Sequence, residues 1–461
     1  MFFEHFFEKG LAQKSYLIGC QKTGEAIVID PRRDIAQYLR VARENSLRIT
    51  KVAETHIHAD FLSGSRELAA ATGAEILLSN EGGTEWQYGF AHTGLRDGDS
   101  IGVGNLRLDV VHTPGHTPEH ISFVLYDLPA GPQPMMAFTG DFVFVGDVGR
   151  PDLLEEAAGI KDTKVRGARD LWRSLARFRE LPEYVTVWPA HGAGSACGKA
   201  LGAVPSSTVG YELATNWALA IEDEETFVKE LLDGQPEPPW YFAEMKVRNR
   251  AGAPVLSDPA MPPGIDADEL ARMPAAQVLD TRSRYAFAGG HIPGSFSVPM
   301  DSSFSNWAGW TLAYDKPIVL IAADDDLEDA VWSLRRIGLD SVVGYLESLD
   351  PWIESGREAA HTEQVTAPEA WRRRAEYTII DVRSQAEFAE GHIDGALNIY
   401  AGHLSRNADA IPTDRPILVH CQTGYRSIIA ASTLERLGFD SVVNVIGGYE
   451  ALAREFDAVR A

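Results

Sequence analysis

Apolar runs of strand length alternate with longer amphipathic segments along this chain. In the first half, the apolar runs predict strands over 15–19, 26–29, 51–54, 107–111, 121–126 and 136–138. Helical patterns lie between these runs, for example over 34–46 and 164–175. The pattern predicts an α/β unit over residues 1–250, and the Pro-, Gly- and Ala-rich segment from Ala251 predicts a boundary after it.

The second half contains an internal repeat. The segment VLDTRSRYAFAGGHIPGSFSVP is echoed by IIDVRSQAEFAEGHIDGALNIY. Apolar runs over 379–382, 417–420 and 442–445 alternate with helical patterns over 427–437 and 449–459, which predicts parallel sheets covered by helices. Residues 262–356 and 362–461 are therefore predicted to be two copies of one α/β domain. The matched positions are Asp280 and Asp381, Arg282 and Arg383, His291 and His392, and Gly294 and Gly395.

The composition restricts the classes of partner. The 461 residues carry a formal net charge of -24, which argues against nucleic acid and anionic membranes. The N-terminal segment lacks the apolar core of a secretory signal, and no window is apolar enough to predict a membrane span. The three cysteines, Cys20, Cys197 and Cys421, are too few for a disulfide framework and fit a reducing compartment. We expect a cytoplasmic protein.

Histidines and acids gather at the predicted strand ends of the first half. Imidazoles and carboxylates placed in this way can converge on one metal ion. The sequence therefore predicts a metal site in this unit. The contributing motifs are THIHAD with His56, His58 and Asp60, HTPGHTPEH with His112, His116 and His120, FTGD with Asp141, and WPAHG with His191.

The order of these motifs resembles the metallo-β-lactamase superfamily. The segment Gly149–Asp152 after FTGD resembles the persulfide dioxygenase branch. The resemblance implies an αββα fold and one Fe(II) per chain, held by His56, His116 and Asp141. It also implies a reaction in which a thiol persulfide and O₂ give sulfite and the thiol.

One position departs from the hydrolytic members, such as glyoxalase II. They have a second-metal histidine directly after the Asp of the first motif, where this chain has Phe61. A two-metal hydrolytic centre is therefore disfavoured, although a thioester hydrolase stays an alternative. His58, Asp60 and His191 are interpreted as groups that orient the ligands, or as the remains of a second metal site. His112 is expected to be structural.

Two further residues of this unit have open roles. Cys197 follows His191 in a Gly-rich segment, so it could carry a persulfide near the metal, or be an inert packed cysteine. Arg150 could contact an anionic substrate or pair with Asp152. Cys20 follows an apolar run and is expected in the core.

The last repeat contains a candidate nucleophile. In ILVHCQTGYRS, an apolar strand ends at Cys421 and a helix is predicted from about Ser427. The loop and the helix N-terminus, together with Arg426, would stabilise a thiolate or persulfide anion. The segment resembles the rhodanese domain, and the four residues between Cys421 and Arg426 indicate sulfur transfer and not phosphatase chemistry. The predicted persulfide loop comprises Gln422, Thr423, Gly424 and Tyr425, with Ser427 after it.

The middle repeat has no nucleophile. Ala322 or Ala323 stands where the cysteine should be, and Asp324, Asp325 and Asp326 follow. This copy is predicted to be structural.

Together, these features predict a two-step sulfur pathway. The iron site would form sulfite, and Cys421 would pass a sulfane sulfur to sulfite and give thiosulfate. The expected partners are a small thiol persulfide, O₂ and sulfite, with the thiol left open. The resemblance also implies a homo-oligomer, a dimer or a tetramer. A rhodanese sulfur carrier with a non-catalytic metal domain is the remaining alternative.

Overall fold

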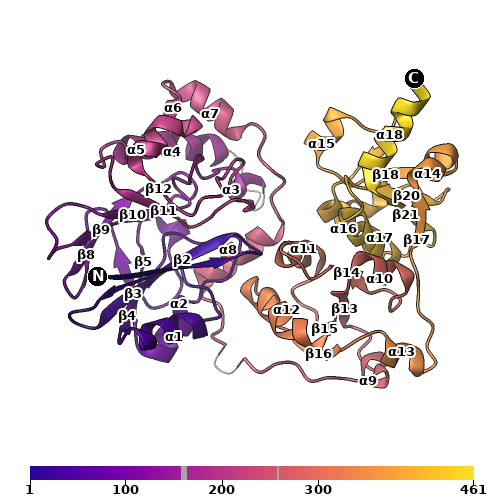
Figure 1. Cartoon of the computed structure of the whole chain (residues 1–461), viewed down its shortest axis with the longest axis horizontal. Helices are drawn as coiled ribbons and strands as arrows, with labels where there is room; N and C mark the ends of the chain where they lie inside the picture. Colours follow the sequence, from indigo (N-terminus) through magenta and orange to yellow (C-terminus); the bar gives the residue numbers. More distant parts are fainter. Residues whose placement is uncertain (157–162, 257–258, 461) are drawn as a thin grey trace. The chain divides into compact units, whose positions relative to one another are not determined.

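The computed structural model describes residues 1–156, 163–256 and 259–460. The chain forms two compact units. The first comprises Met1–Pro259 together with Arg335–Gly338, and the second comprises the other residues from Ala260 onward. Figure 1 shows the elements of each unit with their labels.

Two six-stranded sheets form the first unit. In the first sheet, β1, β2 and β3 are antiparallel, and β3 to β6 are parallel. The second sheet is antiparallel except between β10 and β11. The first sheet has the order β1 (Phe2–Glu8), β2 (Gln13–Cys20), β3 (Glu25–Ile29), β4 (Arg48–Ala53), β5 (Glu75–Ser79) and β6 (Thr93–Leu95). The second has the order β12 (Ser207–Thr208), β11 (Thr186–Pro189), β10 (Met136–Gly140), β9 (Ile121–Asp127), β8 (Leu106–His112) and β7 (Ser100–Val103).

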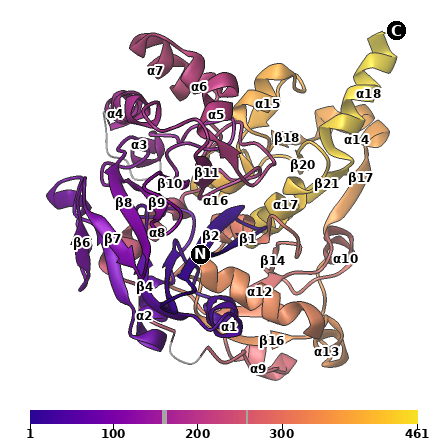
Figure 2. The ribbon, with the colours of Figure 1, turned by 60° about the vertical axis from the view of Figure 1, so that its left-hand side comes forward.

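The apolar faces of the two sheets meet in one core. Ile18 and Ile27 of the first sheet pack in the same cluster as Leu108 and Phe123 of the second. Helices cover the outer faces: Tyr38 and Leu68 belong to the cluster outside the first sheet, and helices α4 to α7 contribute to the cluster outside the second. The predicted αββα arrangement is confirmed (Figures 1 and 2).

Burial and periodicity account for these elements. Every residue of β2 is buried, as expected for a strand covered on both faces. Helix α4 buries Ala168, Leu171, Leu175 and Phe178, a spacing of three and four residues that places them on one face. The helices of this unit are α1 (Ala36–Glu44), α2 (Ser65–Thr72), η1 (Thr84–Trp86), α3 (Leu153–Glu156), α4 (Thr163–Phe178), α5 (Val209–Thr215), α6 (Trp217–Ala220), α7 (Glu224–Leu232) and α8 (Tyr241–Ala251).

Two parallel sheets form the second unit, one in each repeat. The middle repeat has the order β14 (Phe296–Ser297), β13 (Gln277–Asp280), β15 (Ile318–Ile321) and β16 (Val342–Leu346). The last repeat has the order β17 (Glu363–Thr366), β21 (Val442–Ile446), β20 (Ile417–His420), β18 (Thr378–Asp381) and β19 (Leu397–Asn398). The predicted parallel sheets are confirmed.

Helices cover both parallel sheets. Helix α17 also contacts β14 of the middle repeat (Figure 2). There the Ser432 hydroxyl accepts a hydrogen bond from the Ser297 amide at 3.0 Å. The helices of the middle repeat are α9 (Ala267–Ala271), α10 (Arg284–Gly289), α11 (Phe304–Thr311), α12 (Asp324–Arg336) and α13 (Asp350–Glu354). Those of the last repeat are α14 (Ala367–Arg373), η2 (Arg374–Glu376), α15 (Gln385–Glu390), η3 (Ala401–His403), α16 (Leu404–Asn407), η4 (Ala408–Ala410), α17 (Arg426–Arg436) and α18 (Gly448–Arg460).

Candidate metal centre and sulfur-transfer loop

Three predicted ligands converge in the first unit. The Nε2 atoms of His56 and His116 lie 3.8 Å and 3.6 Å from Oδ2 of Asp141. All three side chains are buried, and these three atoms have no hydrogen-bond partner among the described residues. Buried polar atoms are rarely left without a partner. Three lone pairs that face one another fit a metal ion with two imidazoles and one carboxylate.

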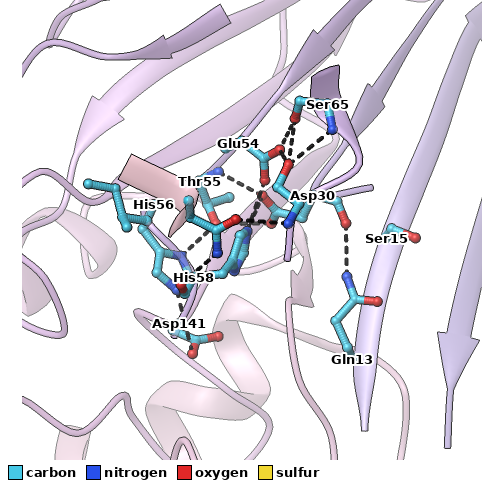
Figure 3. A network of polar contacts seen from close by, with 12 residues as sticks. Gln13, Ser15, Asp30, Glu54, Thr55, His56, His58, Ser65 and Asp141 are labelled. Atoms are coloured by element: carbon cyan, nitrogen blue, oxygen red, sulfur yellow. Dashed lines mark hydrogen bonds and ion pairs between the residues drawn. The ribbon is translucent and has the colours of Figure 1, made fainter. Parts of the chain in front are cut away.

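A hydrogen-bonded relay orients His56 (Figure 3). The Thr55 hydroxyl donates to Oδ2 of Asp30 at 2.9 Å. Its lone pair is then free to accept from Nδ1–H of His56, also at 2.9 Å. The proton therefore lies on Nδ1, and the Nε2 lone pair faces the metal position.

Backbone groups orient the other two ligands. Nδ1–H of His116 donates to the carbonyl of Arg150 at 2.9 Å, which leaves its Nε2 as the acceptor. The backbone N–H of Asp141 donates to Nε2 of His120 at 3.1 Å. Gly140, with a φ of 53°, ends β10 here, and a Cβ on it would lie 2.5 Å from that histidine nitrogen. Only glycine fits this approach.

Electrostatics favour the forms that bind metal. Burial lowers the pKa of His116 to about 4 and that of His56 well below its usual value, so both imidazoles are neutral. Burial raises the pKa of Asp141, but His191 and His116 lower it by a larger amount, so the net pKa lies below its usual value. Neutral imidazoles and an ionised carboxylate are the protonation states that metal binding requires.

His191 bridges two carboxylates. Its Nδ1 lies 2.6 Å from Oδ1 of Asp141, and its Nε2 lies 2.8 Å from Oδ2 of Asp60. Burial opposes the charged imidazolium, but Asp141 and Asp60 raise the pKa of His191 well above its usual value. His191 is thus a cation between the acids that a second metal would otherwise share.

His58 points away from the metal position. Its Nε2 lies 3.1 Å from Asp30 and 3.0 Å from Glu54 (Figure 3). Burial lowers the pKa of His58, but the two acids raise it to about 10. The protonated ring therefore balances the charge of Asp30, the acid that also holds the Thr55 relay.

Cys197 and Arg150 lie beside this centre. The thiol of Cys197 is buried and clusters with Asp60 and His191, and burial followed by Asp141 raises its pKa to about 12. The Arg150 guanidinium pairs with Asp152 at 2.5 Å and donates to the carbonyls of Ala196 and Pro236. Arg150 is 1% exposed, so its contacts here are with the protein and fix the loop that holds Cys197.

The predicted persulfide loop links β20 and α17. Cys421 lies directly after β20 and is 1% exposed, and its Sγ accepts a hydrogen bond from the Gly424 amide at 3.2 Å. The Gln422 side chain accepts from Arg383 at 3.3 Å. Thr423, Tyr425 and Ser427 complete the turn into α17, and Ser427 is fully buried.

Arg426 is held by an acid. Its two terminal nitrogens donate to Glu387 at 2.7 Å and 2.6 Å. Glu387 also accepts from the Ser384 amide in the capping box of α15. One carboxylate therefore fixes both the start of α15 and the arginine at the start of α17.

The middle repeat keeps the scaffold and lacks the loop. In both copies an aspartate that ends a strand, β13 or β18, pairs with an arginine at 2.6 Å, and a histidine stacks on a phenylalanine. Ala322 follows β15 as Cys421 follows β20, but α12 begins two residues later, at Asp324. The residues that the two copies share thus support the fold in both, and the copies differ at the loop that contains Cys421.

Several residues of the metal centre carried no sequence signal. Asp30, Thr55 and Glu54 belong to strand ends that only the tertiary fold brings together. Lys246, in α8, looks like an ordinary helix residue in the sequence. His120 lies in the same histidine motif as His112, eight residues after it. That position is the sequence feature that pointed to a role for His120 near Asp141.

Two family models match the chain. The model of the metallo-beta-lactamase superfamily matches residues 9–191, and the rhodanese-like domain matches residues 266–355 and 366–455. In the part of the chain that the structure describes, no helix has the length and apolar character needed to cross a membrane.

Curated relatives and a solved structure extend these matches. "Persulfide dioxygenase ETHE1, mitochondrial" of Bos taurus is 31% identical over 225 residues, which are 48% of this chain and 77% of that protein. A hydroxyacylglutathione hydrolase of Rhodospirillum rubrum is 33% identical over 38% of this chain, which spans only 60% of that protein. A metallo-beta-lactamase structure from Staphylococcus aureus subsp. aureus COL shares 46% identity, with a TM-score of 0.70, over 75% of this chain and 98% of that chain.

Proposed function

We propose that this chain, which belongs to the persulfide dioxygenase family of the metallo-β-lactamase superfamily and carries two rhodanese-like domains, oxidises a thiol persulfide with O₂. The balanced reaction is R–S–SH plus O₂ and H₂O giving R–SH, sulfite and two protons. The observation that carries this proposal is the set of three buried, mutually facing ligand atoms of His56, His116 and Asp141.

One Fe(II) per chain is the metal that we propose for this triad. Two imidazoles and one carboxylate leave coordination positions open, and a ferrous ion supplies the electrons that activate O₂. The protein holds His56 through Thr55 and His116 through the Arg150 carbonyl, so the ligands are oriented before the substrates enter.

The bridging position of His191 supports a single metal. A second cation between Asp60 and Asp141 would have to displace the His191 imidazolium from both acids. Phe61 is fully buried and offers no ligand, and its ring lies 4.4 Å from that of His58 with the two planes tilted by 38°. These two features favour the oxygenase over a two-metal thioester hydrolase, although hydrolases are among the relatives.

The last repeat would consume the sulfite. The Cys421 thiolate attacks the outer sulfur of a second persulfide, and the S–S bond breaks to release R–SH and leave a cysteine persulfide. Sulfite then attacks that outer sulfur, so that thiosulfate forms and the Cys421 thiolate is regenerated. The Gly424 amide, 3.2 Å from Sγ, supports the anionic forms of the cysteine.

The test measures O₂ uptake, sulfite and thiosulfate with the iron-loaded full-length protein and a thiol persulfide. We expect O₂ uptake that is lost in His116→Ala and kept in Cys421→Ser, with sulfite accumulating in place of thiosulfate in the latter. Two metals per chain with thioester hydrolysis would favour the hydrolase. Sulfur transfer without metal-dependent O₂ uptake would favour the carrier.

A further inference from the structure

A cavity of about 780 Å³ lies beside the metal centre. Its lining includes Ile57, which follows the ligand His56, and Gly115, which precedes the ligand His116. Trp86 of η1 and Lys246 of α8 also line it. The volume is in the range of pockets that bury a whole small-molecule ligand, which is far more than O₂ and two sulfur atoms occupy. The cavity therefore has room for the carbon skeleton of the thiol.

Lys246 is buried in the wall of this cavity. The residue is 9% exposed, and its Nζ is covered and has no hydrogen-bond partner among the described residues. The nearest aromatic contact is Trp86, whose ring centre lies 5.6 Å from Nζ. A buried ammonium without a hydrogen-bonded anion is unfavourable, so a hydrogen-bonded anion is expected from a ligand.

The nearby acids do not neutralise Lys246 directly. Glu119 is buried, and its Oε1 accepts hydrogen bonds from the Ile57 amide and the Thr117 hydroxyl, at 2.8 Å and 2.9 Å. Its Oε2 has no hydrogen-bond partner among the described residues, and its charge acts on Lys246 without a hydrogen bond between them. No ion pair within 4.0 Å joins Lys246 to an acid of the described residues. Asp152 is paired with Arg150, and Asp141 with His191. Lys246 therefore has a negative charge nearby but no hydrogen-bonded anion, and its ammonium can donate to an anionic ligand.

The other charged residues that line the cavity are of both signs. Of the lining residues, Arg166, Arg250 and Glu85 are exposed and Asp170 is partly exposed. Arg250 donates to the Glu85 carbonyl at 2.9 Å. These exposed charges are of both signs, whereas the buried Lys246 is a single ammonium beside the indole of Trp86.

We infer that Lys246 recognises an anionic group, a carboxylate or a phosphate, on the carbon skeleton of the thiol that carries the persulfide. This inference rests on the proposed function for the identity of the ligand as a thiol. It makes Lys246 a specificity-determining residue: the metal centre takes the sulfur end, and Lys246 selects carriers that bear an anion over neutral ones.

The test measures binding by calorimetry with the iron-loaded full-length protein and S-methylated thiols, which cannot react. S-methylglutathione provides carboxylates, S-methyl coenzyme A provides phosphates, and S-methylpantetheine provides a neutral carrier with the same thiol arm as coenzyme A. Wild-type affinities for the first two separate a carboxylate from a phosphate source. Lys246→Met removes the charge, Lys246→Arg keeps it, and Lys229→Met removes an exposed lysine of α7 as the control.

We expect Lys246→Met to weaken binding of the preferred anionic carrier about 10- to 100-fold, as for a lost charged hydrogen bond. Binding of the neutral carrier should not change, and Lys246→Arg should restore most of the loss. With the matching persulfides, KM should rise and kcat should change little. The same loss for neutral and anionic carriers, or no loss for either, would overturn the inference.

These readouts are separable from the proposed function and from misfolding. Binding of capped thiols requires no turnover, so a wild-type protein without O₂ uptake would refute the dioxygenase and leave the binding result intact. Replacing an unpaired buried charge with an apolar side chain should not destabilise the fold. The thermal unfolding temperature of Lys246→Met is therefore expected at or above that of the wild type.

Discussion

His191 and Asp141 share a hydrogen bond of 2.6 Å between Nδ1 and Oδ1. The bond occupies one oxygen of the carboxylate and leaves Oδ2 facing the two histidine ligands. Asp60, on the other side of the ring, fixes the orientation of His191. The metal ligand thus depends on a residue that does not face the metal position itself.

Replacing His191 should weaken the metal centre. In His191→Ala, Asp141 loses its partner and can rotate, so we expect iron affinity to fall about 10- to 100-fold, as for other groups that orient ligands. Iron retained against a competing chelator under anaerobic conditions measures this. His5→Ala, an exposed histidine of β1, is the control and should retain iron as the wild type does. An unchanged affinity in His191→Ala would show that Asp141 needs no such support.

The Thr55 relay gives a second test. Thr55→Val keeps the shape of the side chain and removes the hydroxyl that links Asp30 to His56. We expect iron affinity to fall about 10-fold or more, because the tautomer and ring orientation of His56 are no longer fixed. Thr50→Val, on the strand β4 that precedes Thr55, is the control, since the Thr50 hydroxyl contacts a carbonyl at 3.4 Å and makes no other hydrogen bond with the described residues. Equal iron affinities of the two variants would show that the hydrogen bonds of Thr55 do not contribute to iron binding.

The sequence predicted strands correctly where every residue of the apolar run is buried. The runs over 26–29 and 417–420 are β3 and β20 in the structure, because a strand buried on both faces is apolar throughout. Strand β1 (Phe2–Glu8) was not predicted. It is an edge strand paired only with β2, and its aromatic and charged residues showed no clear alternation.

The candidate site was predictable only in part. His56, His116 and Asp141 belong to motifs with a fixed order, and the structure brings their ligand atoms together. Asp30 and Lys246 could not be found in the same way. Asp30 reaches Thr55 because β3 and β4 are neighbours, and Lys246 lies beside the centre because α8 packs there, so both depend on contacts that no local pattern encodes.

Gly448 should be required by the persulfide loop. Its φ is +58°, and a Cβ on it would lie 2.4 Å from the Cys421 carbonyl. Gly448→Ala should therefore add a clash, costing about 1–3 kcal/mol, to a left-handed strain of about 1–2 kcal/mol. Gly395→Ala is the matched control, because its φ is +81° and no atom of the described residues lies within 4 Å of the added Cβ.

Thiosulfate formation and thermal unfolding separate the two glycine variants. Gly395→Ala should lose stability from strain alone and keep its rate of sulfur transfer. Gly448→Ala should lose more stability, and its sulfur transfer should fall at least 10-fold because the clash displaces the backbone of Cys421. Equal effects in both variants would mean that the loop adapts to the added Cβ.

The pair between Glu387 and Arg426 predicts a pH dependence. Burial raises the pKa of Glu387, but the hydrogen bonds and charge of Arg426 lower it to about 2. Because the folded pKa lies below the unfolded value of 4.5, the pair stabilises the domain above about pH 4.5. This contribution should be lost as the pH falls from about 4.5 to about 2.

Hydrogen exchange of peptides from α15 and α17 tests this contribution. We expect Glu387→Gln to exchange faster than the wild type at pH 7, because Arg426 has lost its charged partner. The capping box of α15 can persist, since the amide oxygen of glutamine also accepts from the Ser384 amide. The difference should shrink toward pH 2, where the wild-type carboxyl is itself becoming protonated. Glu390→Gln, at the exposed end of the same helix, should show no comparable pH-dependent difference. A Glu387→Gln effect that stayed constant from pH 7 to pH 2 would mean that packing of the side chain, and not its charge, supports the loop.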